Sequence, residues 1–446
     1  MNICMFTNTY PPHVGGVARS VSTFAADLHR QGHRVMVVAP TFPETRDQEG
    51  AAVRVVRVPA IQNFNGSDFS VRVAMPFLLT QAIDDFAPDI IHSHHPFLLG
   101  DAALRTAKYR HLPLFFTHHT LYERYTHYVP LDSPTLKRFV IHLSTEYSNL
   151  CTRIIAPSCS IAELIAQRGV TRPIDVIPTG IDTRFFAAGD GKGFRQRYGL
   201  PEDSLVVGHV GRLALEKNLA FLTRAVALFL RQDPAARFLV AGKGPGEQEI
   251  RDICQEHGVA DRLVMVGILQ GDDLSGAYRA MDIFVFSSQS ETQGMVLAEA
   301  LAAGNAVVAL DGPGVREVVR DNDNGRLLPA DGSYGEFAGA IRQLAEDATF
   351  RQNCRARAGR VAELFARERC VAKLIDAYRV ALALPPERLG REDDAEQPWE
   401  NLLTRIETEW DLLAEKASAL FDSLDEEEEK IVRNDKCGMR DENGGS

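Results

Sequence analysis

The stretch IFVFSSQSETQGMVLAEALAAGNAVVA, residues 283–309, carries the clearest structural signal in this sequence. It begins and ends with short apolar runs that are typical of buried strands. Between them, a polar loop leads into a longer apolar segment of helical character. A strand, a helix and a second strand in this order predict one unit of a parallel sheet.

Two glutamates stand near the start of the predicted helix. Glu291 lies in the loop and Glu299 about one turn inside the helix. Both side chains can therefore face a ligand held at the N-terminus of the helix, where backbone N–H groups favour an anion. By spacing alone, two glutamates eight residues apart fit a solvated helix face better, so the pair is a candidate site that needs further support.

Similar units extend in both directions along the chain. One helix is expected before the second strand: Gly32 suits the position after its end, and its apolar face consists of Val17, Val21, Phe24, Ala25 and Leu28. Buried strands are expected at residues 2–7, 34–39, 53–58, 89–92, 114–117 and 153–156, and again at 205–210, 238–241, 263–266, 283–286 and 306–309.

This alternation predicts an α/β protein with two doubly wound domains, residues 1–185 and 186–384. Glycine and charged residues gather around 178–199, where the apolar periodicity lapses. Residues 385–446 form an acidic tail with a heptad-spaced apolar stripe. The stripe fits either a coiled coil that makes a homo-oligomer or a helix packed on the body; its members are Trp399, Leu403, Ile406, Trp410, Leu413, Ala417, Leu420 and Leu424.

Composition and charge exclude several classes of protein. With 45% apolar and 24% charged residues, the chain is typical of a well-packed globular protein. The tail holds 19 acidic and 8 basic residues, which accounts for the whole net charge of −11. A neutral body without a basic stripe argues against nucleic acid as a partner. Neither a membrane-spanning run nor a signal peptide is evident, so a cytoplasmic protein is expected.

Histidines cluster after two of the expected strands. The first cluster is His92-Ser93-His94-His95 and the second is Thr117-His118-His119-Thr120. Because strands alternate faces, one histidine of each neighbouring pair is expected to point at the ligand cleft. Zinc is the competing interpretation, but neither carboxylates nor cysteines stand at recognisable ligand spacing, so no metal is expected.

Three further strand ends carry residues suited to an anion. Gly15-Gly16 opens a helix after the first strand, although a tight turn alone also explains two glycines. After the strand at 205–210, Arg212 offers a planar fork and Lys217 a point charge, which together suit a diphosphate. The glycine-rich turn at residues 242–246 is weaker evidence.

Taken together, these motifs resemble the retaining, nucleotide-sugar-dependent glycosyltransferases of family 4, over residues 1 to about 383. The resemblance implies the GT-B fold, two Rossmann-like domains that face each other across a cleft. It also implies site roles: Glu291 would contact the donor sugar and Glu299 the ribose, and His119 would lie near the reacting carbon. Arg212 and Lys217 would bind the diphosphate, and Gly16 would lie in the loop that approaches the donor phosphate and the acceptor. The sugar and phosphates would contact the backbone of Gly294, Met295, Val296 and Leu297.

The resemblance implies metal-independent chemistry without a cofactor. Cleavage of the sugar–diphosphate bond builds negative charge on the leaving group, which Arg212, Lys217 and helix N-termini can stabilise. The departing phosphate would help to deprotonate the incoming hydroxyl, and attack from the same face would retain the configuration. The family-level default donor is UDP-glucose.

One departure from the family pattern bears on the acceptor. Gln293 replaces the aromatic residue that many members carry, and with residues 119–128 it makes the chain similar to members that glucosylate diacylglycerol. His94, Tyr122 and Tyr125 are candidate acceptor contacts. A lipid acceptor requires peripheral contact with the inner face of the membrane, and an amphipathic helix could supply it through Leu136, Phe139, Val140, Leu143 and Tyr147, unless this face packs on the core.

Alternatives from other classes remain open at this stage. A soluble saccharide or metabolite is the rival acceptor. A sugar-nucleotide epimerase is disfavoured by Glu291 with Glu299, and a non-catalytic scaffold by the intact set of site residues. A plain NAD oxidoreductase is disfavoured because the first strand lacks the G-x-G-x-x-G turn.

Overall fold

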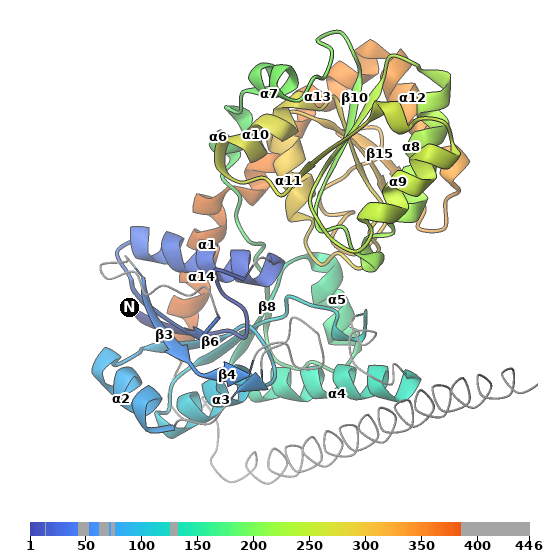
Figure 1. The fold of residues 1–446 in the computed structure, drawn as a ribbon. Helices are drawn as coiled ribbons and strands as arrows, with labels where there is room; N and C mark the ends of the chain where they lie inside the picture. The colour runs from blue at the N-terminus through green and yellow to red at the C-terminus, as the bar shows by residue number, and fades with distance from the viewer. Residues whose placement is uncertain (14, 43–52, 62–70, 73–75, 125–132, 385–446) are drawn as a thin grey trace, which may run out of the picture.

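The computed structural model describes residues 1–13, 15–42, 53–61, 71–72, 76–124 and 133–384. Within these residues, two separate parallel sheets are each covered by helices on both faces, as Figure 1 shows. The predicted α/β class and the two doubly wound domains are therefore confirmed. The tail at 385–446, with its heptad stripe, lies outside the described residues, and so does Tyr125.

The first domain contains a sheet with the strand order β3-β2-β1-β6-β7-β8-β9. Its strands are β1 (Asn2–Phe6), β2 (Arg34–Pro40), β3 (Arg54–Val58), β6 (Ile90–Ser93), β7 (Leu114–Thr117), β8 (Arg153–Ala156) and β9 (Ile174–Val176). A separate antiparallel pair joins β4 (Ala60–Ile61) to β5 (Val71–Arg72). The helices are α1 (Gly16–Arg30), α2 (Pro76–Phe86), α3 (Leu99–Tyr109), η2 (Tyr122–Arg124), α4 (Pro134–Leu150) and α5 (Cys159–Gln167).

The second domain contains a sheet with the order β12-β11-β10-β13-β14-β15. Its strands are β10 (Val206–Val210), β11 (Arg237–Ala241), β12 (Leu263–Gly267), β13 (Ile283–Phe286), β14 (Ala306–Leu310) and β15 (Gly325–Leu328). The α-helices of this part of the chain are α6 (Thr183–Ala187), α7 (Gly191–Arg197), α8 (Leu219–Gln232), α9 (Glu247–Glu256), α10 (Gly271–Ala280), α11 (Met295–Ala302), α12 (Tyr334–Glu346), α13 (Ala348–Ala362) and α14 (Arg367–Leu382).

All the expected strands are present, but the two-residue strands β4 and β5 and two strands of the main sheets were missed. The strands β9 and β15 contain Asp175 and Arg326 within runs of three and four residues, so they lack a continuous apolar signal. The predicted face of α1 is confirmed, because Val21, Phe24 and Leu28 are buried. Gly32 has φ +82, the conformation expected of a residue that ends a helix.

The strand order of each sheet marks one edge where a ligand can bind. In each domain the chain moves outward from the first strand and then returns to its other side, at β6 beside β1 and at β13 beside β10. Such a switch point opens a crevice at the carboxyl ends of the two strands. The histidine clusters and both glutamates come from loops and helices at these ends.

The last described helix, α14, crosses back to the first domain. Val371, Leu374 and Tyr378 are buried in the same core as Val21 and Phe24, and Figure 1 shows α14 beside α1. Arg367, at the start of α14, pairs with Asp27 of α1. The predicted range of 186–384 for the second domain therefore includes a helix whose apolar face belongs to the first domain.

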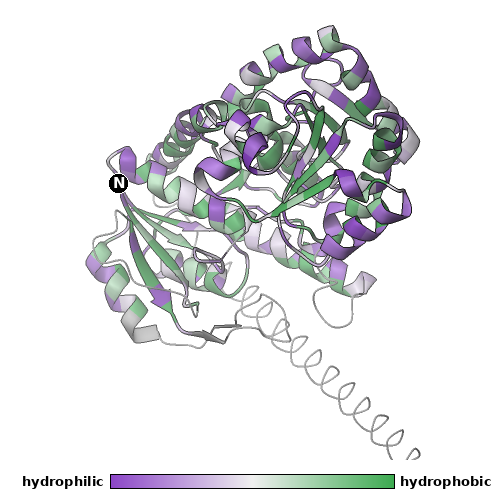
Figure 2. Cartoon of the chain, turned by 45° about the horizontal axis from the view of Figure 1, so that its top comes forward, coloured by the Kyte–Doolittle hydropathy of each residue, from purple (hydrophilic) through white to green (hydrophobic). Residues whose placement is uncertain are grey.

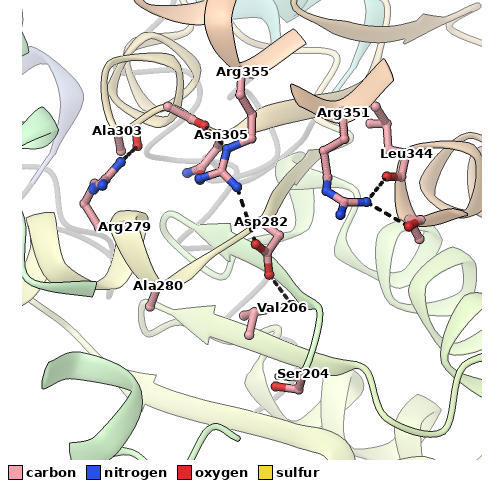
Figure 3. A network of polar contacts seen from close by, with 12 residues as sticks. Ser204, Val206, Arg279, Ala280, Asp282, Ala303, Asn305, Leu344, Arg351 and Arg355 are labelled. Atoms are coloured by element: carbon pink, nitrogen blue, oxygen red, sulfur yellow. Dashed lines mark hydrogen bonds and ion pairs between the residues drawn. The ribbon is translucent and has the colours of Figure 1, made fainter. Parts of the chain in front are cut away.

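Hydrophobic residues make up most of the strands, which Figure 2 colours green, and the buried apolar residues of the helices pack against them. A polar network braces the amino end of the second sheet, where Asp282 accepts a 2.9 Å hydrogen bond from the backbone N–H of Val206 and lies 3.6 Å from Arg355 (Figure 3). Arg279 donates to the carbonyl of Ala303 close by. These charges join β10, α10 and α13 at the edge opposite the switch point, so they serve the fold of the domain.

Candidate active site

Histidines from two neighbouring strands meet at the carboxyl edge of the first sheet. His94 follows β6 and His119 follows β7, and His94 Nδ1 lies 2.9 Å from His119 Nε2 with the rings stacked. Their sequence neighbours turn elsewhere: His118 packs against Tyr122, and His95 Nδ1 accepts a hydrogen bond from the backbone N–H of Asn8. The structure thus brings one histidine of each cluster together, at strand ends where the sequence predicts that one histidine of each pair faces the ligand cleft.

The two paired histidines are neutral at pH 7. Burial lowers the pKa of both His94 and His119 well below 6.5, and neighbouring histidines lower each pKa further. One proton therefore lies between His94 Nδ1 and His119 Nε2. Among the described residues, His94 Nε2 has no hydrogen-bond partner. Because a buried N–H is left unpaired less readily than a lone pair, we place the proton on His94 Nδ1, which makes His119 Nδ1 a hydrogen-bond donor.

A second layer holds this pair in place. The His92 ring stacks on His94 at 4.3 Å, and its nitrogens contact Thr117 Oγ1 at 2.7 Å and the Tyr378 hydroxyl at 2.6 Å. Tyr378 belongs to α14, so the returning helix completes the support of the histidines. Sequence reasoning could not find this contact, because Tyr378 lies far along the chain from every strand of the first domain.

At the second sheet, Glu291 and Lys217 form an ion pair in front of α11. Lys217 Nζ lies 3.2 Å from Glu291 Oε2, and the backbone N–H of Gly294 donates to Glu291 Oε1 at 3.2 Å. Burial alone would raise the pKa of Glu291, but the charge of Lys217 and the backbone N–H groups of Gly294 and Gln293 outweigh it and lower the pKa. Glu291 is therefore ionised at pH 7.

The starts of α1 and α11 approach each other. A Cβ placed on Gly16 would lie 3.8 Å from Met295 Cε, the first residue of α11. Gly294 precedes this helix with φ +81, and a Cβ there would lie 3.0 Å from the carbonyl oxygen of Gly314, so both conformation and space favour glycine. The N-cap residues of α1 and α11 are Gly15 and Gly294, which have no side chain to cap the helix. The first N–H groups of both helices suit an anion between the domains.

A cavity of about 370 Å³ lies beside the Lys217–Glu291 pair. Arg124 lines it from the first domain, and Leu215, Glu216, Asn218, Gln289 and Ser290 line it from the second. Arg212, half-exposed, pairs with Glu216 at this edge. The two cations predicted to bind a diphosphate thus lie on one loop after β10, each paired with a carboxylate.

Glu299 is positioned differently from Glu291. It is 1% exposed, its Oε2 accepts a 2.7 Å hydrogen bond from the Tyr278 hydroxyl, and its Oε1 lies 2.5 Å from Nη2 of Arg19 in the first domain. Neither Arg19 nor Tyr278 was singled out from the sequence. The sequence does contain an indication that Arg19 lies near the site, because it stands one helical turn after Gly16.

The structure also places the candidate acceptor and metal-binding residues. His94 is fully buried behind His119, and the Tyr122 hydroxyl is buried without a partner among the described residues. Among all the residues that the structure describes, no three His, Cys, Asp or Glu side chains converge in a group that could hold a metal ion.

Two family models match the chain almost end to end over its two domains. Residues 14–185 match the model described as Glycosyltransferase Family 4, and residues 191–361 match Glycosyl transferases group 1. A D-inositol 3-phosphate glycosyltransferase of Stackebrandtia nassauensis is 30% identical over 315 residues, which are 67% of this chain and 70% of that protein. The chain belongs to glycosyltransferase family 4.

Other relatives of this glycosyltransferase have names that differ in donor and product. An alpha-monoglucosyldiacylglycerol synthase of Streptococcus pneumoniae is 29% identical over 350 residues, 76% of this chain and 77% of that protein. A GDP-mannose-dependent alpha-mannosyltransferase of Mycobacterium tuberculosis is 29% identical over 342 residues, 76% of this chain and 85% of that protein. The protein is thus a nucleotide-sugar glycosyltransferase.

Solved structures identify the fold of the glycosyltransferase as GT-B. Sucrose-phosphate synthase of Thermosynechococcus elongatus has a TM-score of 0.70 at 20% identity, covering 85% of this chain and 99% of that one. The Anabaena protein HepE in complex with UDP has a TM-score of 0.67 at 21% identity, covering 85% and 100%. The predicted GT-B architecture is confirmed.

In this glycosyltransferase, the expected membrane-facing helix packs largely on its own domain. Leu136, Leu143 and Tyr147 of α4 are buried, whereas Phe139 and Val140 are only half-buried. Most of the predicted apolar face thus belongs to the core, and a membrane contact would have to use the remainder. Across the described residues, no helix is both long and apolar enough to cross a bilayer.

The loop before α11 fastens the two domains of the glycosyltransferase together. Thr292 Oγ1 donates to the carbonyl of His119 at 2.8 Å, and Ser158 Oγ donates to the carbonyl of Thr292 at 2.8 Å. Gln293 uses both ends of its amide on Thr179, whose N–H and carbonyl each lie 2.8 Å away. The glutamine that departs from the family pattern is therefore a buried clamp between the domains.

We expect Gln293→Leu to lower the free energy of unfolding by about 2–4 kcal/mol, because it leaves the buried N–H and carbonyl of Thr179 unpaired. Gln255→Leu is the matched control, since Gln255 is an exposed amide on α9, and its midpoint should equal that of the wild type. Urea denaturation of the three proteins measures the difference. Equal midpoints for Gln293→Leu and the wild type would contradict a clamp.

Proposed function

We propose that this protein is a retaining, metal-independent hexosyltransferase that moves glucose from UDP-glucose to a hydroxyl of diacylglycerol. The observation that supports it best is the meeting of the Lys217–Glu291 pair, the α11 N-terminus and His119, joined through the Thr292 contact. This arrangement offers a cation, a carboxylate and a neutral histidine around the gap between two domains of a nucleotide-sugar glycosyltransferase.

In the proposed complex, the diphosphate lies against Arg212, Lys217 and the first N–H groups of α11. Lys217 then exchanges one anionic partner, Glu291, for another. The ionised Glu291 accepts hydrogen bonds from the sugar hydroxyls, which positions the ring and places negative charge near a reacting carbon that becomes positive. Gly16 allows the start of α1 to approach the donor closely.

In the proposed reaction, the bond between the anomeric carbon and the diphosphate oxygen breaks, and both electrons leave with the diphosphate. The acceptor hydroxyl attacks from the same face, and its proton passes to the departing phosphate oxygen, which retains the configuration. His119 is neutral and donates a hydrogen bond through Nδ1, so it orients a substrate hydroxyl and takes no proton in this step.

The glucose donor and the diacylglycerol acceptor are supported by relatives. Alpha-monoglucosyldiacylglycerol synthases of Streptococcus pneumoniae and Acholeplasma laidlawii are 29% and 26% identical to the chain. Gln293 and residues 119–128 supply the corresponding sequence similarity. With a lipid acceptor, the protein acts in the cytoplasm on the inner face of the membrane, as a peripheral protein. His94, which contacts His119, and Tyr122, which packs against His118, would then support the acceptor side.

The test is transfer from a panel of nucleotide sugars, with diacylglycerol micelles and soluble sugars offered separately as acceptors and EDTA present throughout. We expect glucose transfer from UDP-glucose to diacylglycerol, undiminished by EDTA, with an α-linked product on NMR. Transfer only from GDP-mannose would contradict UDP-glucose as the donor. Reaction only with soluble acceptors would contradict diacylglycerol as the acceptor. Loss of transfer in EDTA, restored by Mg²⁺, would overturn metal independence.

Lys217→Ala in the same assay tests the donor site, with Lys192→Ala as its control because Lys192 is an exposed lysine paired with Glu202. We expect Lys217→Ala to lower kcat/KM about 10- to 100-fold, since a charge-assisted hydrogen bond to the leaving group is lost. Equal kcat/KM for the two variants would contradict the assignment.

A further inference from the structure

Three cations around the cleft are each paired with a carboxylate. Lys217 pairs with Glu291 and Arg212 with Glu216, both within the second domain. Arg19 pairs with Glu299 across the two domains. The first two cations already have a role in the proposed donor site, whereas Arg19 has none.

The Arg19–Glu299 pair closes off the buried carboxylate. Glu299 is 1% exposed, and its oxygens are covered by the Tyr278 hydroxyl on one side and by Arg19 on the other. Arg19 itself keeps 44% of its side chain exposed, and the charge of Glu299 raises the pKa of its guanidinium. A ribose can therefore reach Glu299 only when Arg19 moves.

The place of Arg19 in the fold suits it to a phosphate. It stands one helical turn after Gly16, and Glu299 stands one turn after Met295, so the ion pair lies just behind the point where the starts of α1 and α11 approach. A guanidinium is a rigid, planar fork that is weakly hydrated, and it binds carboxylates and phosphates with the same geometry. When Arg19 exchanges Glu299 for a phosphate, the Glu299 carboxylate keeps the hydrogen bond from the Tyr278 hydroxyl and gains those of the ribose hydroxyls in place of the ion pair.

We propose that Arg19 is a donor-binding residue that neutralises Glu299 while the site is empty and pairs with the diphosphate once the ribose hydroxyls take its place on Glu299. This inference rests on the proposed function, because it takes the donor to be a nucleoside diphosphate sugar with its ribose at Glu299. Arg19 is then a cation that the first domain contributes to a diphosphate site built mainly on the second, and donor binding draws the two domains onto one ligand.

The test compares a nucleoside diphosphate with its nucleoside, because only the former carries the group that Arg19 would bind. Calorimetry measures Kd for UDP and for uridine, and in parallel for GDP and guanosine, with the wild type, Arg19→Gln and Arg19→Lys. Arg105→Gln is the matched control, an exposed arginine on α3 that pairs with Asp101.

We expect Arg19→Gln to weaken UDP binding about 10- to 100-fold, since a charge-assisted contact is lost. The same variant should bind uridine several-fold more tightly, because the nucleoside no longer has to break an ion pair. Arg19→Lys should retain part of the UDP affinity, and Arg105→Gln should match the wild type for both ligands.

Each other pattern overturns the proposal. Equal weakening of UDP and uridine would mean that Arg19 only supports the fold, and tightening of both would mean that it only obstructs the site. If Arg19→Gln fails to fold, the double variant Arg19→Gln/Glu299→Gln removes both charges, and it should still bind UDP more weakly than Glu299→Gln alone. If the wild type binds none of the four ligands, the proposed donor, a nucleoside diphosphate sugar, is wrong, and the proposed role of Arg19 is wrong as a consequence.

Discussion

Glu291→Ala is expected to lower kcat/KM for transfer by about 100- to 1,000-fold, the range seen when one preorganised electrostatic contact to a transition state is removed. Lys217 and the backbone N–H of Gly294 keep Glu291 ionised and aimed at the gap between the domains. The variant loses both the sugar contact and the negative charge beside the reacting carbon. Initial rates over a range of donor concentrations separate kcat from KM.

Two further variants make the Glu291 result specific. Glu291→Gln keeps the shape but not the charge, so it should lose most of the same activity if the charge matters. Glu256→Ala removes an exposed glutamate at the end of α9 and should behave as the wild type. Turnover within threefold of the wild type for Glu291→Ala would show that the sugar is held elsewhere.

The second large effect is a steep loss of stability in mild acid. Burial lowers the pKa of His92 and His95 to about 3 and of His118 and His209 to about 4, from 6.5. Below pH 6.5 the unfolded chain therefore binds more protons than the folded one. The stabilisation is fully present above pH 6.5 and is lost as the pH falls toward these folded-state values.

The size of the acid effect follows from the number of histidines involved. Each such histidine removes about 1.4 kcal/mol per pH unit once the pH is well below 6.5. Several together remove several kcal/mol per unit, against a total stability of about 5–15 kcal/mol for a typical protein. Urea denaturation at pH 7.5, 6.5 and 5.5 should therefore show a falling midpoint, with unfolding complete in little urea at the lowest pH.

Single substitutions can assign the acid effect. His209→Asn removes one buried imidazole, which packs near Phe284 and Phe286, and should reduce the slope of stability against pH by about 1.4 kcal/mol per unit. His142→Gln, at a histidine 58% exposed on α4, should leave the slope unchanged. A stability that stays constant from pH 7.5 to pH 5.5 would mean that these histidines take up protons in the folded protein as readily as in the unfolded chain.

Much of the fold could be predicted because its signals are local. Most strands of the two main sheets are short apolar runs. The helix α1 shows its buried face at helical spacing, with Gly32 at its end. The strands without such runs, β9 and β15, were missed. Loops after adjacent parallel strands also meet at one edge, which is why one histidine of each cluster could be expected at the ligand cleft, whereas the contact between His94 and His119 came only from the structure.

The sequence by itself determined the α/β class, the two doubly wound domains and the strand ends where chemistry is possible. The reason is that apolar residues recur every two residues in a strand and every 3.6 in a helix, and this spacing indicates which face is buried. Only the tertiary structure decided which distant groups meet. Gln293 and Thr179 are 114 residues apart, and His92 and Tyr378 are 286 apart. The Arg19–Glu299 pair and the return of α14 likewise depend on how two finished domains dock. Docking is set by the shape and charge of surfaces assembled from many segments, and no local pattern records them.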